Sequence, residues 1–125
     1  MNDQSIEKEI QEKGLTAPRI TPDDIENNIA SEHYFTAFEG AMSRDELSEF
    51  DKYDPTWEVP KSIQALELLT FCVLVLKNGF TVTGESACAS PENFDAELGR
   101  KIARQNAVNK IWPLMGYELK ERLSK

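Results

Sequence analysis

Apolar side chains recur at helical spacing along most of the chain, and this spacing predicts an all-α protein. The pattern is most complete in residues 62–77, where the apolar positions are Ile63, Leu66, Leu69, Val73 and Leu76. Within this stretch the chain is apolar nearly all round, which is typical of a helix buried at the centre of a bundle. The other predicted helices cover residues 4–13, 21–38, 90–112 and 114–123, and the second of these ends either near Ser31 or at Phe38. We therefore expect a small helical bundle whose centre is a hairpin of helices 62–77 and 90–112.

The predicted helix ends depend on capping residues and prolines. Thr21 precedes a proline and stands three residues before Asp24, and Ser90 also precedes a proline. A hydroxyl before a first-turn proline is a pattern of helix N-termini. The proline after Trp112 ends or kinks the helix that contains it.

Residues 71–83 also permit a second interpretation. Residues 71–76 and 80–83 are apolar or β-branched, and Asn78-Gly79 lies between them, which is a signal for a β-hairpin. We favour a helix because the apolar pattern from residue 62 is too long for a strand and its first half is rich in Leu, Ala and Glu. A short extended piece at residues 80–84 is compatible with either interpretation.

Small side chains form a ridge on the predicted helix 90–112. Gly99, Ala103 and Ala107 recur every four residues. A glycine inside a helix costs up to about 1 kcal/mol relative to alanine. Its presence predicts that another backbone approaches closely there, and helix 62–77 is the expected neighbour.

The charge of the chain is unevenly distributed. Its 125 residues suit a single domain, with an N-terminal arm at residues 1–20 and an irregular acidic insertion at residues 39–60. Residues 1–60 hold 5 basic and 15 acidic side chains, and residues 61–125 hold 9 basic and 7 acidic ones, for a net charge of −8. An acidic front half repels phosphate backbones, which argues against binding of nucleic-acid polymers.

Two segments resemble a known family. Residues 69–119, LTFCVLVLKNGFTVTGESACASPENFDAELGRKIARQNAVNKIWPLMGYEL, and the front segment GLTAPRITPDDIENNIASEHYFTA resemble small tailed-phage proteins often labelled gp-forty-nine-like. The most specific parts are Asn78-Gly79-Phe80 and residues 84–87, 91–95 and 99–117. Residues 41–60 match least and are interpreted as a variable insertion. The resemblance implies a phage or prophage origin, and it implies no activity and no site residues.

The cellular location follows from what the chain contains. The N-terminus is charged rather than apolar, and the longest apolar stretch, residues 65–76, is too short to cross a bilayer. Two cysteines, Cys72 and Cys88, without an apolar leader indicate a reducing compartment. We expect a protein of the bacterial cytoplasm without a membrane partner, and the sequence leaves a homo-oligomer open.

Few residues suggest catalysis or metal binding. One His and two Cys are too few and too scattered for a zinc site, so no metal and no cofactor is predicted. A nucleophile pair of Cys88 and His33, oriented by Glu85 or Asp95, is the one catalytic arrangement considered. An ordinary loop thiol and an ordinary histidine are the favoured interpretation, so no catalytic residue is predicted.

Two stretches are candidate binding sites. One is a basic and polar stripe on helix 90–112, where arginines can hold an anion such as a nucleotide phosphate; a solvated face is the competing interpretation. It comprises Arg100, Lys101, Arg104, Asn106 and Lys110. The other is the acidic and aromatic segment 44–58, with Phe50, Tyr53 and Trp57, read either as a patch for a host protein or as a surface loop with its own apolar cluster.

The sequence thus favours a non-enzymatic phage accessory protein that acts by binding, in host takeover or against host defence. The alternative is a sponge for small nucleotides that uses the basic stripe. A Cys-dependent enzyme is the third possibility.

Overall fold

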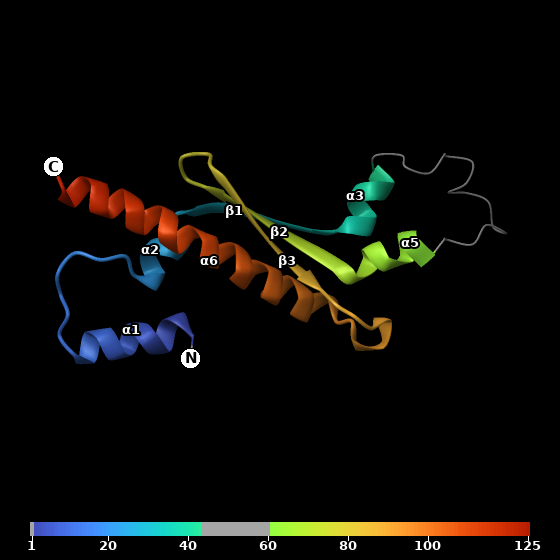
Figure 1. The fold of residues 1–125 in the computed structure, drawn as a ribbon, viewed down its shortest axis with the longest axis horizontal. Helices are drawn as coiled ribbons and strands as arrows, with labels where there is room; N and C mark the ends of the chain where they lie inside the picture. Colours follow the sequence, from blue (N-terminus) through green and yellow to red (C-terminus); the bar gives the residue numbers. More distant parts are fainter. Residues whose placement is uncertain (1, 44–60) are drawn as a thin grey trace.

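A three-stranded antiparallel sheet lies at the centre of the computed structural model, which describes residues 2–43 and 61–125 (Figure 1). Its strands are β1 (Ile29–Thr36), β2 (Leu69–Leu76) and β3 (Thr81–Ala87), in that spatial order. The helix α6 (Ala96–Leu123) crosses one face of the sheet and contacts β2 and β3. The fold is therefore mixed α/β, and the prediction of an all-α bundle is wrong.

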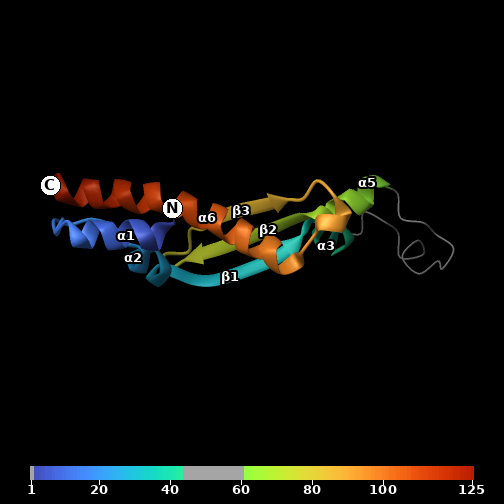
Figure 2. The same cartoon turned by 90° about the horizontal axis from the view of Figure 1, so that it is seen from below.

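Short helices occupy the two ends of the sheet. The helices α1 (Asp3–Glu12) and α2 (Pro22–Asn27) lie beside the C-terminal half of α6 (Figure 2). The helices α3 (Ala37–Ser43) and α5 (Lys61–Gln64) lie at the opposite end (Figure 1). Two 3-10 helices complete the described elements, Ala65–Leu68 before β2 and Pro91–Asn93 before α6.

The strongest helix prediction, residues 62–77, fails after Leu68. From there the chain extends, and burial alternates along β2: Thr70, Cys72, Leu74 and Leu76 are buried on the side of α6. The intervening side chains of β2 are apolar as well, so the run looks continuous in sequence. A strand that is apolar on both faces cannot be told from a buried helix by periodicity alone. Its aromatic and β-branched residues are what favour the strand.

The alternative interpretation of residues 71–83 is the correct one. Gly79 has a φ of +90°, a conformation that only glycine adopts readily. Its N–H donates to the carbonyl of Leu76 at 2.9 Å, and the Asn78 side chain accepts from the N–H of Phe80 at 2.9 Å. This turn joins β2 to β3 as an antiparallel hairpin.

The predicted helix 21–38 is correct only in its first turns. The Thr21 hydroxyl accepts from the N–H of Asp24 at 3.1 Å, and the Asp24 carboxylate accepts from the N–H of Thr21 at 2.9 Å. This reciprocal cap starts α2 as expected. The helix ends at Asn27, however, and residues 29–36 form β1, which pairs with β2. Its neighbouring strand supplies the backbone hydrogen bonds that a continued helix would have supplied.

The last two predicted helices are one continuous helix. α6 begins at Ala96, where the Asp95 carboxylate accepts from the N–H of Leu98 at 3.0 Å. It runs through Pro113 to Leu123. The predicted start at Ser90 is therefore five residues early, because residues 91–93 form a separate 3-10 turn.

The close backbone approach predicted at Gly99 lies instead further along the small-residue ridge. At Gly99 the nearest atoms belong to the Thr70 side chain of β2, within the expected segment 62–77. Gly99, Ala103 and Ala107 are buried against the sheet. A Cβ on Gly84 of β3 would lie well inside 3.0 Å of backbone atoms of Ala103 and Ala107. The backbones of α6 and β3 therefore meet directly. The core around this contact also contains Ile25, Leu74, Val82, Val108 and Ile111.

Candidate functional site

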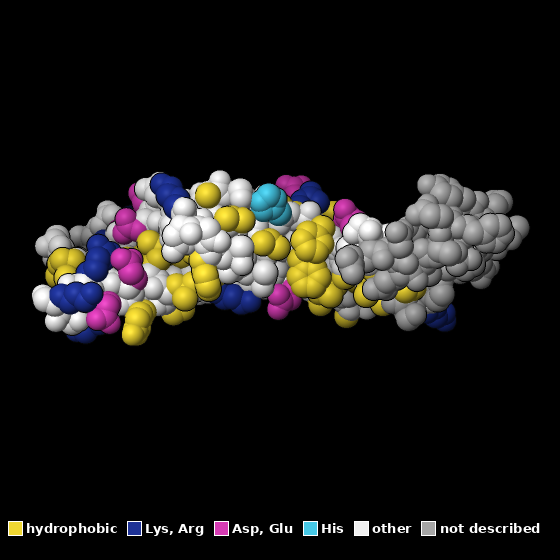
Figure 3. Space-filling model, turned by 90° about the horizontal axis from the view of Figure 1, so that it is seen from above, with side chains coloured by type: hydrophobic (Ala, Val, Ile, Leu, Met, Phe, Trp, Pro, Cys, Tyr) yellow, Lys and Arg dark blue, Asp and Glu magenta, His cyan; other side chains and the backbone are white. Residues whose placement is uncertain are grey.

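The face of the sheet opposite α6 carries an apolar patch. The rings of Phe35 on β1 and Phe71 on β2 lie with their centroids 5.6 Å apart, and Val73 and Val75 continue the row along β2. Figure 3 looks onto this face, where hydrophobic side chains form a band beside the histidine. Within residues 2–43 and 61–125, no helix as long as α6 contacts this face. The short helix α3 contacts β1 and β2, and a Cβ on its Gly40 would lie 3.8 Å from the Phe35 ring. We call Phe35, Phe71, Val73 and Val75 the open-face patch.

The polar residues around the patch are mostly uncharged. Strand pairing places Ser31 and His33 on the same face from β1, and Thr83 and Glu85 from β3. The His33 ring nitrogen Nε2 lies 2.9 Å from the Ser31 hydroxyl. This face therefore has little charge although the chain carries −8 overall. An apolar centre with an uncharged polar rim suits a protein partner better than a charged ligand.

The residues of the predicted basic stripe lie on different sides of α6. Asn106 donates to the backbone carbonyl of Glu85 at 2.8 Å, and the Lys110 ammonium lies 3.5 Å from the Thr83 hydroxyl. These two side chains therefore reach the edge of β3, whereas Arg104 reaches in the other direction, toward α2 and β1. Lys101 is exposed and pairs with Glu97 within the helix at 3.5 Å.

Arg104 is engaged by two carboxylates. Its guanidinium donates twice to Glu26 of α2, at 2.7 and 3.1 Å, and twice to Glu32 of β1, at 3.0 and 3.1 Å. These hydrogen bonds raise the pKa of Arg104 and, together with the Tyr34 hydroxyl, lower the pKa of Glu32. One guanidinium with two carboxylates leaves a net negative charge. An anion at this point would have to displace a carboxylate.

The charged cluster connects to the buried sheet surface. The Tyr34 hydroxyl donates to Glu32 at 2.7 Å. Burial and this hydrogen bond raise the pKa of Tyr34, and burial raises the pKa of the Cys72 thiol beside it. Both groups are thus neutral at pH 7, which suits a structural role in joining α2, β1 and α6.

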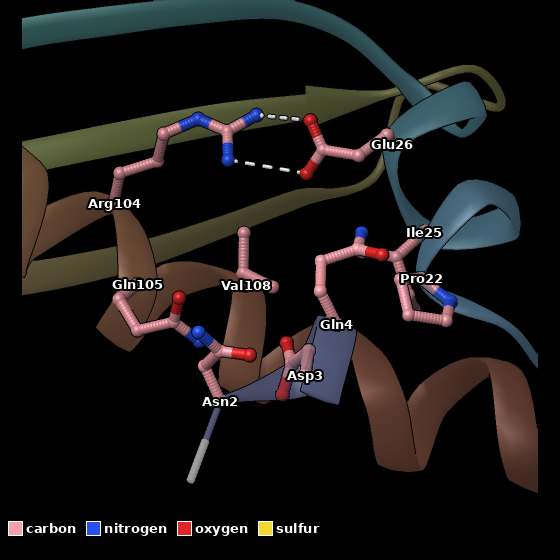
Figure 4. Close-up of a pocket in the computed structure, with 9 residues that line it drawn as sticks. All are labelled: Asn2, Asp3, Gln4, Pro22, Ile25, Glu26, Arg104, Gln105 and Val108. Carbon is pink, nitrogen blue, oxygen red and sulfur yellow. Dashed lines mark hydrogen bonds and ion pairs between the residues drawn. The ribbon is translucent and has the colours of Figure 1, made fainter. Parts of the chain in front are cut away.

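A shallow polar cavity adjoins the cluster. Its volume is about 290 Å³, and the start of α1, α2 and α6 enclose it (Figure 4). Side chains of Asn2, Gln4 and Gln105 provide amides at its rim, while Ile25 and Val108 form its floor. Arg104 and Glu26 are joined to each other at one side. The cavity therefore offers no unpaired arginine to a ligand.

The possible nucleophile pair is not assembled. The N–H of Cys88 donates to the carbonyl of Leu68 at 2.9 Å, beyond the end of β2. His33 lies on β1, at the opposite edge of the sheet, and pairs with Val73 in the middle of β2. Cys88 and His33 are therefore separated by five residues along the strands, about 17 Å, and by two strand spacings across the sheet, about 10 Å. The Cys88 thiol instead donates to the backbone carbonyl of Ser90 at 3.2 Å.

An ion pair outside the predicted sites holds the N-terminal arm. Glu7 of α1 accepts from both terminal nitrogens of Arg19 and, at 2.6 Å, from Gln11. The hydrogen bonds from Arg19 and Gln11 lower the pKa of Glu7 to about 2. Trp112 of α6 adds a longer contact, donating to Asp3 at 3.3 Å. The ion pair thus holds α1 against the segment that follows it, and the Trp112–Asp3 hydrogen bond joins α1 to α6.

Other kinds of site find no support in the residues that the structure describes. These residues contain no cluster of three metal-ligating side chains. Among their helices, none is both long and apolar enough to cross a membrane. The whole segment 44–58 lies outside the described residues, and so do its predicted partner-binding residues Phe50, Tyr53 and Trp57.

Sequence reasoning missed the open-face patch because it placed residues 21–38 and 62–77 in helices. The available signal was the hairpin motif Asn78-Gly79 beside a run rich in Val and Phe. Once β2 is a strand, alternate residues must face opposite sides. Phe71, Val73 and Val75 then fall on the side away from Cys72 and Leu74.

A three-stranded antiparallel sheet covered on one face by a long helix defines a small mixed α/β protein. The chain matches the phage protein (N4 Gp49/phage Sf6 gene 66) family over residues 20–123. Because the match covers most of the chain, the protein belongs to that family, which confirms the resemblance noted in its sequence. No curated protein and no solved structure gives a match.

Proposed function

We propose that this phage protein is a non-enzymatic accessory protein that acts by binding a host protein through the open-face patch. The observation that carries the proposal is the open-face patch, in which Phe35 is exposed and Phe71, Val73 and Val75 are half-buried on the face opposite α6. Phe35 is 38% exposed and lies near the end of the edge strand β1, where it pairs with Phe71. Contiguous exposed apolar surface with a polar rim marks interaction sites.

The remaining features of the molecule are compatible with this role. The separation of Cys88 from His33 removes the catalytic arrangement that the sequence offered, and the cavity beside Arg104 holds no free cation. A host-takeover or anti-defence role agrees with membership of a phage family. Phage accessory proteins of this kind need only a surface that a host protein recognises.

The test is capture from infected cells with matched variants. Phe35→Ser with Phe71→Ser removes the aromatic pair from the patch, and Phe80→Ser removes a more exposed aromatic, at 56%, from the β2–β3 turn. A partner identified by mass spectrometry is then purified and titrated. We expect binding to weaken by about 2 kcal/mol or more in the patch variant, because central aromatic residues dominate interfaces, and to be unchanged in Phe80→Ser.

A further variant separates the patch from the acidic segment. Deleting residues 44–58 tests the earlier prediction that Phe50, Tyr53 and Trp57 bind the partner. Retention of the partner by this deletion, with loss in the patch variant, supports the open face. Loss in the deletion alone contradicts it.

The nucleotide-sponge alternative stays a prediction, and the structure changes how it is tested. Arg104→Glu would place a third carboxylate beside Glu26 and Glu32 and would weaken the fold whether or not a ligand binds. Arg100 is exposed, so Arg100→Glu is the cleaner variant. A shift of the melting temperature with cyclic dinucleotides that Arg100→Glu abolishes would favour the sponge.

A further inference from the structure

The two outer edges of the sheet, along β3 and along β1, differ in how far side chains cover them. Along β3, side chains of α6 occupy the edge: Asn106 donates to the outward carbonyl of Glu85, and Lys110 reaches Thr83. Such side chains prevent another strand from pairing there. The edge of β1 lacks an equivalent cover along its middle in the described residues. Figure 2 shows β1 as the outer strand on this side of the sheet.

The hydrogen-bonding directions along β1 follow from its neighbours. The N–H of Leu76 on β2 donates to the carbonyl of Phe80, so even-numbered residues of β2 point toward β3. Antiparallel pairs alternate, so odd-numbered residues of β2 and their partners on β1 bond to each other. The even-numbered residues of β1 then point outward. Thr36 shows this directly, because its N–H donates to the Glu39 side chain at 3.2 Å.

The free part of this edge is centred on one residue. Glu39 covers Thr36 at one end, and a register shift between Ile29 and Ser31 interrupts the ladder at the other end. The outward backbone groups of Glu32 and Tyr34 remain between them. His33 lies midway.

We infer that β1 pairs antiparallel with β1 of a second copy about a two-fold axis at His33, which joins two sheets into one of six strands. Glu32 of each copy then pairs with Tyr34 of the other copy. The outward N–H and C=O groups of both residues are then all hydrogen-bonded. An isologous contact of this kind closes after two copies.

The charges near the edge permit two acidic chains to meet there. Ser31, His33 and Phe35 point to the open face and carry no acidic group. Glu32 points to the other face, where Arg104 already binds it at 3.0 and 3.1 Å. A basic partner strand would find no unpaired carboxylate at this edge, so the edge suits a strand without an unpaired charge, such as β1 itself.

Pairing also changes the size of the open face. Three strands of seven or eight residues present a flat area of roughly 370 Å², which is about half of the 800 Å² or so that each partner gives to a standard interface. Two copies side by side present one continuous face of about twice that area. The inference goes beyond the proposed function, since either can hold without the other.

The first test is a disulfide trap with a matched control. His33→Cys places two thiols opposite each other at a Cα separation of about 4.5 Å, which is within the range of disulfides. Thr83→Cys is the control, because Thr83 is exposed, on the same face and in register with His33 across the sheet. Unsubstituted protein controls for Cys72 and Cys88. We expect His33→Cys to form a dimer under mild oxidation at least roughly tenfold faster than Thr83→Cys, since strand pairing holds only the former pair together.

The second test measures mass in solution. The unsubstituted protein should sediment at twice its chain mass of 14.2 kDa at concentrations of tens of micromolar, as expected for an interface at the small end of the range. His33→Lys sets like charges opposite each other and should weaken the dimer roughly fivefold, whereas Thr83→Lys should not. A monomer at about 100 µM, or equal trapping at the two positions, overturns the inference. Partner capture at a concentration at which sedimentation shows the His33→Lys variant to be monomeric would show that the proposed function survives that result.

Discussion

The contact between Gly84 and α6 allows the sharpest test of the fold. Gly84→Ala adds one methyl group to β3 at a point where the backbones of Ala103 and Ala107 are closest. The added Cβ would also lie 2.9 Å from the carbonyl carbon of Asn106. All three neighbours are backbone atoms of one helix, so no single side chain can move aside.

The cost can be worked from this geometry. Relief of the overlap requires α6 to move away from β3 by about 1 Å, and a gap of that size forfeits a quarter to a half of the dispersion energy of each contact. Overpacking a core costs typically 1–3 kcal/mol. Because the helix must move as a unit, we expect the free energy of unfolding to fall by about 3 kcal/mol or more. This is a large part of the 5–15 kcal/mol that stabilises a typical domain.

Urea unfolding followed by circular dichroism measures this loss. For a chain of this length, a loss of 3 kcal/mol corresponds to a fall of roughly 10 °C in melting temperature. Gly116→Ala is the control for the substitution itself, because a Cβ at Gly116 meets nothing within 4 Å. Alanine inside a helix is favoured over glycine by up to about 1 kcal/mol, so this variant should be more stable than the unsubstituted protein.

Two results would refute the reasoning. One is a Gly84→Ala variant within about 0.5 kcal/mol of the original, the range of ordinary surface substitutions. The other is a Gly116→Ala variant that loses as much stability as Gly84→Ala. Either would mean that α6 does not lie on β3 as described.

Three further predictions concern charges and thiols. The folded pKa of Glu7, about 2, lies below its ordinary value of 4.5, so the stability it contributes is complete above pH 4.5 and is lost as the pH falls from there toward 2; melting temperatures across this range should fall less steeply in Glu7→Gln. Arg104→Met leaves two carboxylates without their shared cation and should lower the free energy of unfolding by about 2 kcal/mol in urea titrations, with a smaller effect for Lys101→Met, whose ion pair is exposed. Cys72 is fully buried and Cys88 is not, so a thiol reagent on the native protein should modify Cys88 first, as peptide mapping would show; equal rates would contradict the buried position of Cys72.

Local signals in the sequence were sufficient for the parts of the fold that depend on local contacts. Thr21 and Asp24 form the cap that their spacing predicts, and Gly14 ends α1 with a φ of +67°. The small side chains of α6 also indicated a close contact, although the backbone contact lies at Ala103 and Ala107, against β3, rather than at Gly99. Each of these features is decided within a few residues of chain or by one side-chain volume.

The sheet was not predictable in the same way. β1 and β2 are far apart in sequence, and residues 29–36 alone do not show that Val73 and Phe71 will pair with them. The apolar character of β2 on both faces removes the alternation that usually marks a strand beside solvent. The role of Arg104 also depended on this arrangement, because Glu32 reaches it only when β1 lies next to β2.

The connection from β1 to β2 has a consequence for how proteins of this family can vary. The chain leaves the sheet through α3 and returns through α5 and the 3-10 helix Ala65–Leu68, and α3 contacts that 3-10 helix. This contact clamps the base of the connection at one tip of the molecule, far from α1 and from Gly84. Doubling the length of a loop on a fixed base costs only about 0.6 kcal/mol. Peptides grafted between Ser43 and Lys61 should therefore be tolerated, which makes this tip a place where new specificity can be added without refolding the scaffold.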